Sequence, residues 1–311
     1  MRLREYSVLF GLALIWGVSF LFIKIAVMEV SPATTVVLRL AFSVATLALI
    51  GWVRPDLVMG WRRFWKLGVV VGIINNAIPF VLISWGETQI ASGVASILNA
   101  TTPLFTVLLA HWATGPAHES LSTRRVGGVI MGFIGVAVLI GPAIFDLGGT
   151  GLARTLGEMA VLGAAAAYGV GAILSRRFGA TGPLVAPMAC QIPALLVMIP
   201  VAALWSPPTR MPSLLVIGSI AELGIMGTAV AYLLYFWLIR HVGATRTSLV
   251  TYLLPCTALL WGMMFLNERI SWYTVLGLLL VLLGTMTTNG TLSGLFSRRA
   301  VPAATTSLSL D

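Results

Sequence analysis

Hydroxyl and amide side chains recur at helical spacing inside two apolar stretches of this chain. The first stretch carries Ser92, Ser96, Asn99 and Thr102, and the second carries Thr245, Ser248, Thr251 and Tyr252. Spacings of three and four residues place such groups on one face of a helix. These groups could hydrogen-bond the ammonium and carboxylate ends of a small zwitterion, or they could only join helices to one another. We interpret them as the lining of a cavity.

Each polar face ends at a proline in the middle of its stretch, Pro103 in the first and Pro255 in the second. A proline in a helix leaves the carbonyl four residues earlier without its usual donor. The affected carbonyls belong to Asn99 and Thr251, which lie on the polar faces themselves. Free carbonyls at membrane depth are tolerated where they line a cavity. We therefore expect both carbonyls to face a ligand and both prolines to act as hinges.

Two further stretches place a polar or aromatic group on a face that begins with a glycine. Gly72, Asn76 and Pro79 share one helix face, and Gly224, Thr228 and Tyr232 share another. Small residues let helices approach closely, which directs the larger groups inward. We predict that Asn76, Pro79, Thr228 and Tyr232 contact a ligand. The alternative is that these residues only form hydrogen bonds between helices and contact no ligand.

Two large aromatic residues, Trp16 and Tyr168, lie in the middle of apolar stretches. Rings that anchor a helix in a membrane usually lie at the interface with water instead. A ring at mid-depth either fills the core or lines a pocket. We predict that Trp16 and Tyr168, with Tyr232 and Tyr252, flank the side chain of a ligand.

Three charged residues lie within or near the ends of these stretches. Glu222 is the one carboxylate that the expected spans place well inside the apolar region, where it could carry a proton, meet an ammonium group or pair with a basic side chain. Arg39 could bind a carboxylate, but its position favours a long side chain that reaches the membrane surface. Lys24 is expected to anchor the outer end of its helix. Glu222 and Arg39 are the candidates for proton or charge coupling.

The composition requires a membrane to surround these elements. Of 311 residues, 58% are hydrophobic and 9% are charged, and the mean hydropathy is +0.98, whereas soluble proteins carry about 25% charged residues. A bilayer-spanning helix needs about 20 apolar residues. We predict an all-α protein with ten such spans: 7–28, 32–53, 65–86, 90–112, 124–142, 155–176, 183–205, 212–239, 244–266 and 271–289.

The basic residues predict the orientation of these spans. Fourteen lysines and arginines fall in the segments on the side of the N-terminus, and three fall in the loops on the other side. Because cytoplasmic loops are enriched in basic residues, both termini are expected in the cytoplasm. The formal net charge of +9 thus reflects topology, and we expect no nucleic-acid partner.

The sequence also repeats itself at an offset of 152 residues. Trp16 corresponds to Tyr168, Gly72 to Gly224 and Pro103 to Pro255, and beyond one loop the offset becomes 149. Each half contains five spans, an odd number, so the second half must cross the membrane upside down. Inverted repeats around a shared cavity are typical of alternating-access transporters. We predict repeats over residues 1–147 and 148–290, followed by a disordered cytoplasmic tail over 291–311.

Other functional classes find little support in the chain. No pattern for a metal, a nucleotide or a catalytic nucleophile stands in a suitable context, so we expect neither an enzyme nor a cofactor. Cys190 and Cys256 lie inside apolar spans and predict no disulfide framework.

Several of these features together resemble a known family. The Trp16-Gly17 pair with Lys24 behind it, Pro103, and the acidic residues Glu119 and Glu268 at loop ends are similar to the drug/metabolite transporter superfamily. The similarity is to its ten-helix bacterial branch, the EamA-type exporters, and extends over residues 5–290.

The resemblance implies a central cavity lined by spans one, three, four, six, eight and nine. It also implies export of amino acids or related metabolites, most closely of aromatic amino acids. We therefore predict a bacterial inner-membrane exporter of neutral, in particular aromatic, amino acids, with multidrug or nucleoside and purine efflux as the alternative. Its partners would be a small-molecule substrate and the lipid bilayer, and it would be a monomer or a weak homodimer.

Overall fold

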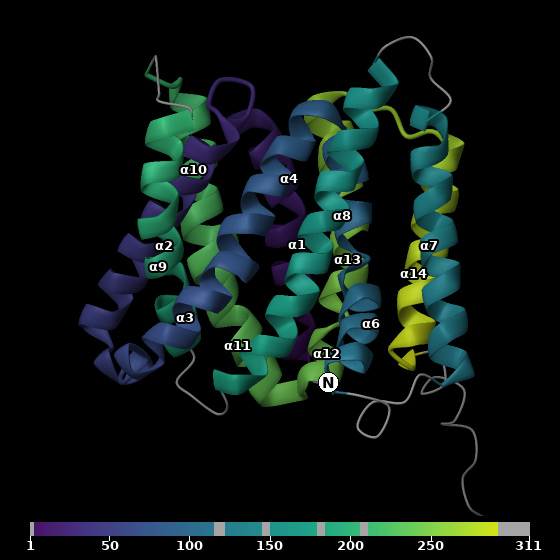
Figure 1. The fold of residues 1–311 in the computed structure, drawn as a ribbon. Helices are drawn as coiled ribbons and strands as arrows, with labels where there is room; N and C mark the ends of the chain where they lie inside the picture. The colour runs from purple at the N-terminus through teal and green to yellow at the C-terminus, as the bar shows by residue number, and fades with distance from the viewer. Residues whose placement is uncertain (1–2, 115–121, 145–149, 179–183, 206–210, 292–311) are drawn as a thin grey trace, which may run out of the picture.

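Ten apolar spans form a helical bundle. The computed structural model describes residues 3–114, 122–144, 150–178, 184–205 and 211–291, and this part of the chain contains helices and no strand (Figure 1). Among these residues, eight stretches are long and apolar enough to cross a membrane, and two shorter apolar helices follow them. The predicted all-α membrane fold with ten spans is confirmed. Glu119 and the tail after Thr291 lie outside the described residues.

The helix bounds follow the expected spans closely. Spans one to five are α1 (Leu3–Ala26); α2 (Pro32–Val53); α3 (Trp65–Gly72), η3 (Ile73–Ala77) and α4 (Ile78–Gln89) in succession; α5 (Ser92–Asn99) with α6 (Thr102–Thr114); and α7 (Thr123–Ile144). Spans six to ten are α8 (Thr150–Ser175); α9 (Val185–Trp205); α10 (Leu214–Gly224), η5 (Ile225–Val230) and α11 (Ala231–Val242) in succession; α12 (Ala244–Thr247) with α13 (Val250–Leu266); and α14 (Trp272–Thr288). The short turns are η1 (Pro55–Leu57), η2 (Trp61–Phe64) and η4 (Arg176–Phe178).

The helices of the two halves pack in corresponding pairs. Span three lies against spans six and seven through the contacts α4–α8 and α3–α9, and span eight lies against spans one and two through α1–α10 and α10–α2. Span four contacts span six, and span nine contacts span one, through α6–α8 and α1–α13. Exchanging each span for the one five places along the chain therefore reproduces these contacts.

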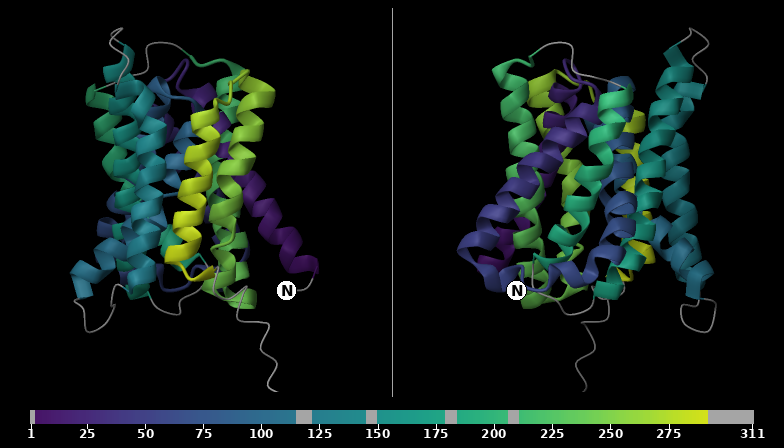
Figure 2. Two further views of the ribbon diagram at one scale, coloured as in Figure 1. Left: turned by 90° about the vertical axis from the view of Figure 1, so that its right-hand side faces the viewer. Right: turned by 60° about the vertical axis from the view of Figure 1, so that its left-hand side comes forward.

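The two ends of the bundle are named here by the position of the chain termini. The N-terminus and the end of α14 lie at one end, here called the terminal face (Figures 1 and 2). The opposite face is reached by the end of α1 and by the turn between α4 and α5. At the opposite face, Ile23, Ile90 and Val94 belong to a buried apolar cluster that also includes Leu259. Its members come from both halves, so apolar contacts hold the halves together there.

Two carboxylates also join the halves at the opposite face. Glu29, between α1 and α2, accepts hydrogen bonds from the Ser213 backbone N–H and hydroxyl, each at 2.8 Å, at the start of α10. These bonds hold the pKa of the Glu29 carboxyl below its usual value. Glu268, after α13, accepts from the N–H groups of Ser92 and Gly93 at 2.6 and 3.1 Å. Each carboxylate thus caps the N-terminus of a helix in the other half.

Spans five and ten form a separate pair at the side of the bundle. Helices α7 and α14 lie next to each other at one edge (Figure 1). Contact between them is close: a Cβ atom added to Gly128 would lie 2.4 Å from the Thr288 hydroxyl and 2.7 Å from the Gly284 carbonyl oxygen.

Substitution of Gly128 tests this close approach. We expect Gly128→Ala to destabilise the protein by about 1–2 kcal/mol because the added methyl group overpacks the contact. Gly127→Ala is the matched control, since nothing lies within 4 Å of an added Cβ atom there. The measurement is unfolding of the two purified variants in detergent, and equal stability of both would contradict the packing.

Candidate functional site

Arg39 lies at the centre of the candidate site. It belongs to α2 and is only 8% exposed. Its Nε–H donates to the Thr228 hydroxyl at 3.0 Å, and its guanidinium carbon lies 3.9 Å from the centre of the Phe80 ring. The expectation that this side chain reaches the membrane surface is wrong, because stacking on a ring and a buried hydroxyl hold it inside the bundle.

The guanidinium has two tyrosines and two carboxyl groups as electrostatic neighbours. These are Tyr168 in α8, Tyr232 in α11, Glu222 in α10 and Glu87 in α4. One oxygen of Glu222 is buried without a hydrogen-bond partner in the described part of the chain. We define the Arg39 cluster by the residues Arg39, Phe80, Tyr168, Glu222, Thr228 and Tyr232. Five of these six residues were singled out by the sequence, and Phe80 was not.

The cluster combines three kinds of recognition chemistry. A guanidinium can bind a carboxylate through two parallel hydrogen bonds. Aromatic rings offer large apolar faces for a second ring or an alkyl chain. A carboxyl group can meet an ammonium group. Together these groups suit a small molecule that carries both charges and an apolar side chain.

The two central spans contain π-helical segments at equivalent positions. Segment η3 covers Ile73–Ala77, and η5 covers Ile225–Val230. An offset of 152 residues relates their first residues, so the irregularity occurs in both halves. In η5 the Thr228 hydroxyl donates to the Leu223 carbonyl, five residues earlier, at 2.7 Å. Single π-turns in helices occur frequently at functional sites.

Close packing by glycine accompanies both π-segments. A Cβ atom on Gly72 would lie 2.2 Å from the Cys190 carbonyl oxygen in α9, and one on Gly224 would lie 2.6 Å from the Arg39 carbonyl oxygen in α2. Pro79, buried just after η3, removes one helical N–H there. Ala231 occupies the corresponding position after η5, so proline alone does not explain the irregularity.

A second polar pair corresponds to Arg39 and Thr228. By the repeat offset Gln191 corresponds to Arg39, and Asn76 corresponds to Thr228. Helix α9 packs against η3 as α2 packs against η5. Asn76 and Gln191 are both buried, and in the described residues the Asn76 Oδ1 and the Gln191 Nε2 have no partner. The Gln191 Oε1 accepts from the Ser43 hydroxyl at 2.5 Å. The pair Arg39–Thr228 is therefore hydrogen-bonded, whereas no hydrogen bond joins Asn76 and Gln191, which we call the open pair.

The polar faces of spans four and nine mostly bond to their own backbone. The Ser96 hydroxyl donates to the Gly93 carbonyl at 2.6 Å, and the Thr251 hydroxyl donates to the Ser248 carbonyl at 2.7 Å. The Asn99 carbonyl was expected to be free, and this is wrong, because it accepts from the Thr102 hydroxyl at 2.7 Å. The Asn99 amide oxygen, in contrast, is buried without a partner in the described residues.

The two proline positions differ between the halves. The helix of span four stops at Asn99 and resumes at Thr102, just before Pro103. Helix α13 runs unbroken through Pro255, and the interruption in span nine lies at Ser248 and Leu249 instead. The role of both prolines as hinges stays a prediction.

The other two aromatic candidates, Trp16 and Tyr252, make their closest described contacts with residues outside the Arg39 cluster. The Trp16 ring packs against Tyr235, with 5.6 Å between the ring centres. The Tyr252 hydroxyl accepts from the Asn289 side-chain amide at 2.8 Å, which attaches it to the end of α14. The structure thus gives Tyr252 a helix-joining contact at the terminal face.

Sequence reasoning missed Glu87 and the partners of Lys24. Glu87 is fully buried in α4, one residue past the expected end of span three, so Glu222 is not the only carboxylate to consider. The Lys24 Nζ donates to the backbone carbonyls of Glu87 and Ile90. Lys24, in the last turn of α1, therefore binds the C-terminal end of α4, and its role as an outer anchor stays a prediction.

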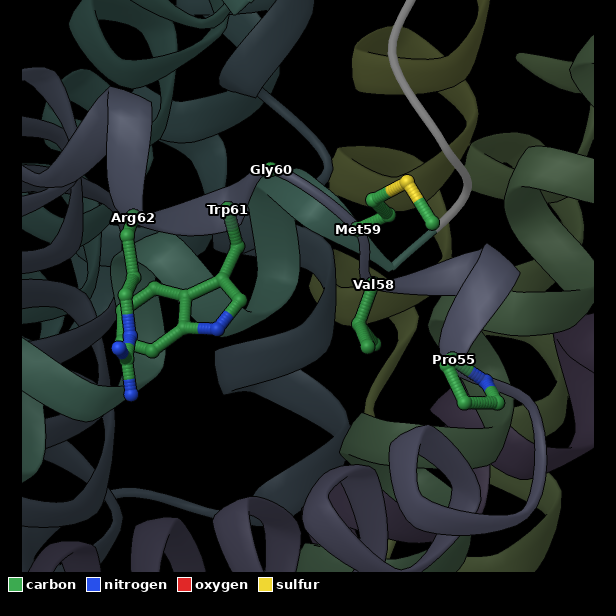
Figure 3. A pocket seen from close by; sticks show the side chains of 6 residues that line it. All are labelled: Pro55, Val58, Met59, Gly60, Trp61 and Arg62. Carbon is green, nitrogen blue, oxygen red and sulfur yellow. The ribbon is translucent and has the colours of Figure 1, made fainter.

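The surface hollow in Figure 3 has a different character from the cluster. It has a volume of ≈ 340 Å³ and is lined by the segment from Pro55 to Arg62 at the terminal face. Its wall is almost wholly apolar, and Trp61 lies beside the Arg62 side chain (Figure 3). None of the predicted ligand-binding residues lies there, so the hollow is no alternative to the Arg39 cluster.

In the described part of the chain, ten apolar spans surround a charged and aromatic cluster, an arrangement that fits a multi-pass membrane protein. The model of the EamA-like transporter family matches residues 3–141 and 155–290. The chain belongs to this family.

Individual relatives extend over nearly the whole chain. An uncharacterised transporter of Archaeoglobus fulgidus is 29% identical over 289 residues, which cover 91% of this chain and 97% of the relative. A protein of Escherichia coli named "Probable amino-acid metabolite efflux pump" is 27% identical and covers 87% of this chain and 89% of its own length. A crystal structure with 19% identity has the same fold, with a TM-score of 0.62 and coverage of 96% and 100%. The chain is thus a membrane transporter of small metabolites.

Proposed function

We propose that the protein exports neutral, in particular aromatic, amino acids or closely related metabolites across a bacterial inner membrane. The observation that carries this proposal is the Arg39 cluster, a buried guanidinium that stacks on Phe80 and has two tyrosines and a carboxyl group as electrostatic neighbours. The name of the Escherichia coli relative, an amino-acid metabolite efflux pump, supports the same substrate class.

Residues of the Arg39 cluster and other predicted site residues bind different parts of the substrate. Arg39 binds the carboxylate, because a guanidinium supplies parallel donors to two oxygens. The open amide oxygens of Asn76 and Asn99 and the carboxyl group of Glu222 accept from the ammonium group. Tyr168, Tyr232 and, more distantly, Trp16 flank the side chain. Ser96, Ser248 and Thr251 line the path, and Tyr252 closes it towards α14.

Transport proceeds by alternating access between two inverted halves, residues 1–147 and 148–290. The bonded pair Arg39–Thr228 and the open pair Asn76–Gln191 support this mechanism, because they are equivalent positions in different states. When the halves exchange shapes, the second pair closes and the first opens, which releases the guanidinium from Thr228. The distribution of basic residues supports a cytoplasmic location of both termini.

A substrate-competition panel tests the proposed function. Purified protein in liposomes is given labelled phenylalanine with an excess of unlabelled tryptophan, threonine, a nucleoside or a lipophilic cation. We expect saturable uptake, with the strongest competition from tryptophan. Competition by the nucleoside or the cation alone would support nucleoside or multidrug efflux instead. Absence of saturable flux for every amino acid would refute the substrate class.

A further inference from the structure

Glu87 is a buried acid that the proposed binding of substrate does not use. It lies near the end of α4 and its exposed fraction is 0%. Both of its carboxyl oxygens lack a hydrogen-bond partner in the described part of the chain. Of the buried side chains there, no other has two carboxyl oxygens in this state. An ionised carboxylate without donors is costly to bury, so this group needs either a proton or a cation.

The charged groups around Glu87 come from several elements. Lys24 in α1, Arg39 in α2 and Glu268 after α13 are its electrostatic neighbours. On α8, which also packs against α4, Arg154 and Glu158 bond to each other at 3.1 Å. Lys24 donates to backbone carbonyls at the end of α4 and forms no ion pair with the Glu87 carboxyl group. A cation is therefore available near Glu87 but is held by other acceptors.

The position of Glu87 couples it to opening of the opposite face. On one side Lys24 binds the carbonyls of Glu87 and Ile90, and on the other Glu268 caps Ser92 and Gly93 across the two halves. The apolar cluster seals the same region with Ile90 and Val94. A path for substrate through this face must separate these contacts, and their separation exposes Glu87 to solution.

We propose that the Glu87 carboxyl group is the proton-exchange site of the transport cycle. It holds a proton while the opposite face is closed. When that face opens, the proton passes to or from water, and the ionised carboxylate turns to the Lys24 ammonium group. Return of the proton allows the face to close again. This inference rests on the proposed transport function and adds its energy source, a proton gradient.

Infrared spectroscopy tests the proton directly and without any substrate. We expect pH-difference spectra of the purified protein in lipid to contain the carbonyl band of a protonated carboxylic acid that Glu87→Gln removes. Glu158→Gln is the matched control, since Arg154 bonds one oxygen of that buried carboxylate, and the band should survive this change. A spectrum in which Glu87→Gln removes no titrating band would overturn the proposal.

Transport measurements then separate coupling from substrate binding. At equal pH on both sides, Glu87→Gln is expected to exchange labelled for unlabelled substrate as the wild type does. Under a pH gradient it should lose uphill accumulation, and Glu87→Asp, which keeps the acid, should retain part of it. If Glu87→Gln still accumulates substrate under a gradient, the proposal is wrong. If the wild type exchanges substrate but ignores the gradient, the proposal also fails while the transport function stands.

Failure of the proposed function has a different signature. Protein that moves no amino acid at all, yet shows the Glu87-dependent infrared band, contradicts the proposed substrate class and supports the proton site. Correct folding of each variant is checked by its elution as a single species from size-exclusion chromatography. Glu87→Gln keeps nearly the same shape as glutamate, so its elution should match that of the wild type.

Discussion

Arg39→Lys is expected to reduce transport of carboxylate-bearing substrates by about tenfold or more, although lysine keeps the positive charge. The bond to Thr228 uses the guanidinium Nε, and the stacking on Phe80 uses the planar guanidinium face. Lysine has neither a planar group nor two parallel donors. The measurement is the initial rate of labelled phenylalanine exchange in liposomes as a function of its concentration.

An analogue without a carboxylate separates recognition from a general structural effect. If Arg39 binds the substrate carboxylate, the amide of phenylalanine should be moved weakly by the wild type and no worse by Arg39→Lys. Arg54→Lys is the control, because Arg54 is exposed and its partner Asp56 lies at the surface. Equal losses for the acid and the amide would show that Arg39 only holds the helices together. An unchanged rate for phenylalanine would contradict its role altogether.

Gly72→Ala is expected to destabilise the bundle by about 3 kcal/mol, the upper part of the range for overpacking a core. The added Cβ atom would lie 2.2 Å from the Cys190 carbonyl oxygen and 3.0 Å from its carbonyl carbon. Backbone atoms of a neighbouring helix cannot turn away as a side chain can, so α3 and α9 must separate. The measurement is the free energy of unfolding in detergent, with transport as a second readout.

Gly218 in α10 supplies the control for Gly72. Nothing lies within 4 Å of an added Cβ atom at Gly218, and alanine is favoured over glycine in a helix by about 1 kcal/mol. Gly218→Ala should therefore be as stable as the wild type or slightly more stable. Wild-type stability of Gly72→Ala would mean that the spans do not approach each other as closely as the structure indicates.

The sequence predicts the bundle well because a membrane restricts the possible structures so strongly. A run of about 20 apolar residues has few alternatives to a helix when its backbone must bond to itself. Burial of Asn76 and Thr228 follows from the same logic, since their faces begin with Gly72 and Gly224. These predictions needed only periodicity and residue size.

Details that depend on the third dimension were not predictable in this way. Arg39 is long enough to reach a membrane surface, and only the positions of Phe80 and Thr228 show why it remains inside. Glu87 looked like a loop residue until α4 was seen to extend to Gln89. The carbonyl of Asn99 is bonded because a threonine three residues later turns back to it.

The sequence contains a feature at both π-segments that predicted close packing but not the change of helix type. Gly72 and Gly224 recur at the repeat offset directly before η3 and η5, and both suggested close helix packing alone. Packing is indeed close at both glycines. The change of helical register after them depends on how α2 and α9 fit against the spans, which a linear pattern does not contain.

Accessibility of Thr228 from the two sides of the membrane tests alternating access most directly. Thr228→Cys is made in protein with Cys190→Ala and Cys256→Ala, and a membrane-impermeant thiol reagent is applied from one side at a time. If two opposed halves expose one buried site in turn, the introduced cysteine should be modified by reagent from either side of the membrane. Bound substrate should slow the modification from both sides. Modification from a single side only, unaffected by substrate, would contradict a shared site that opens alternately.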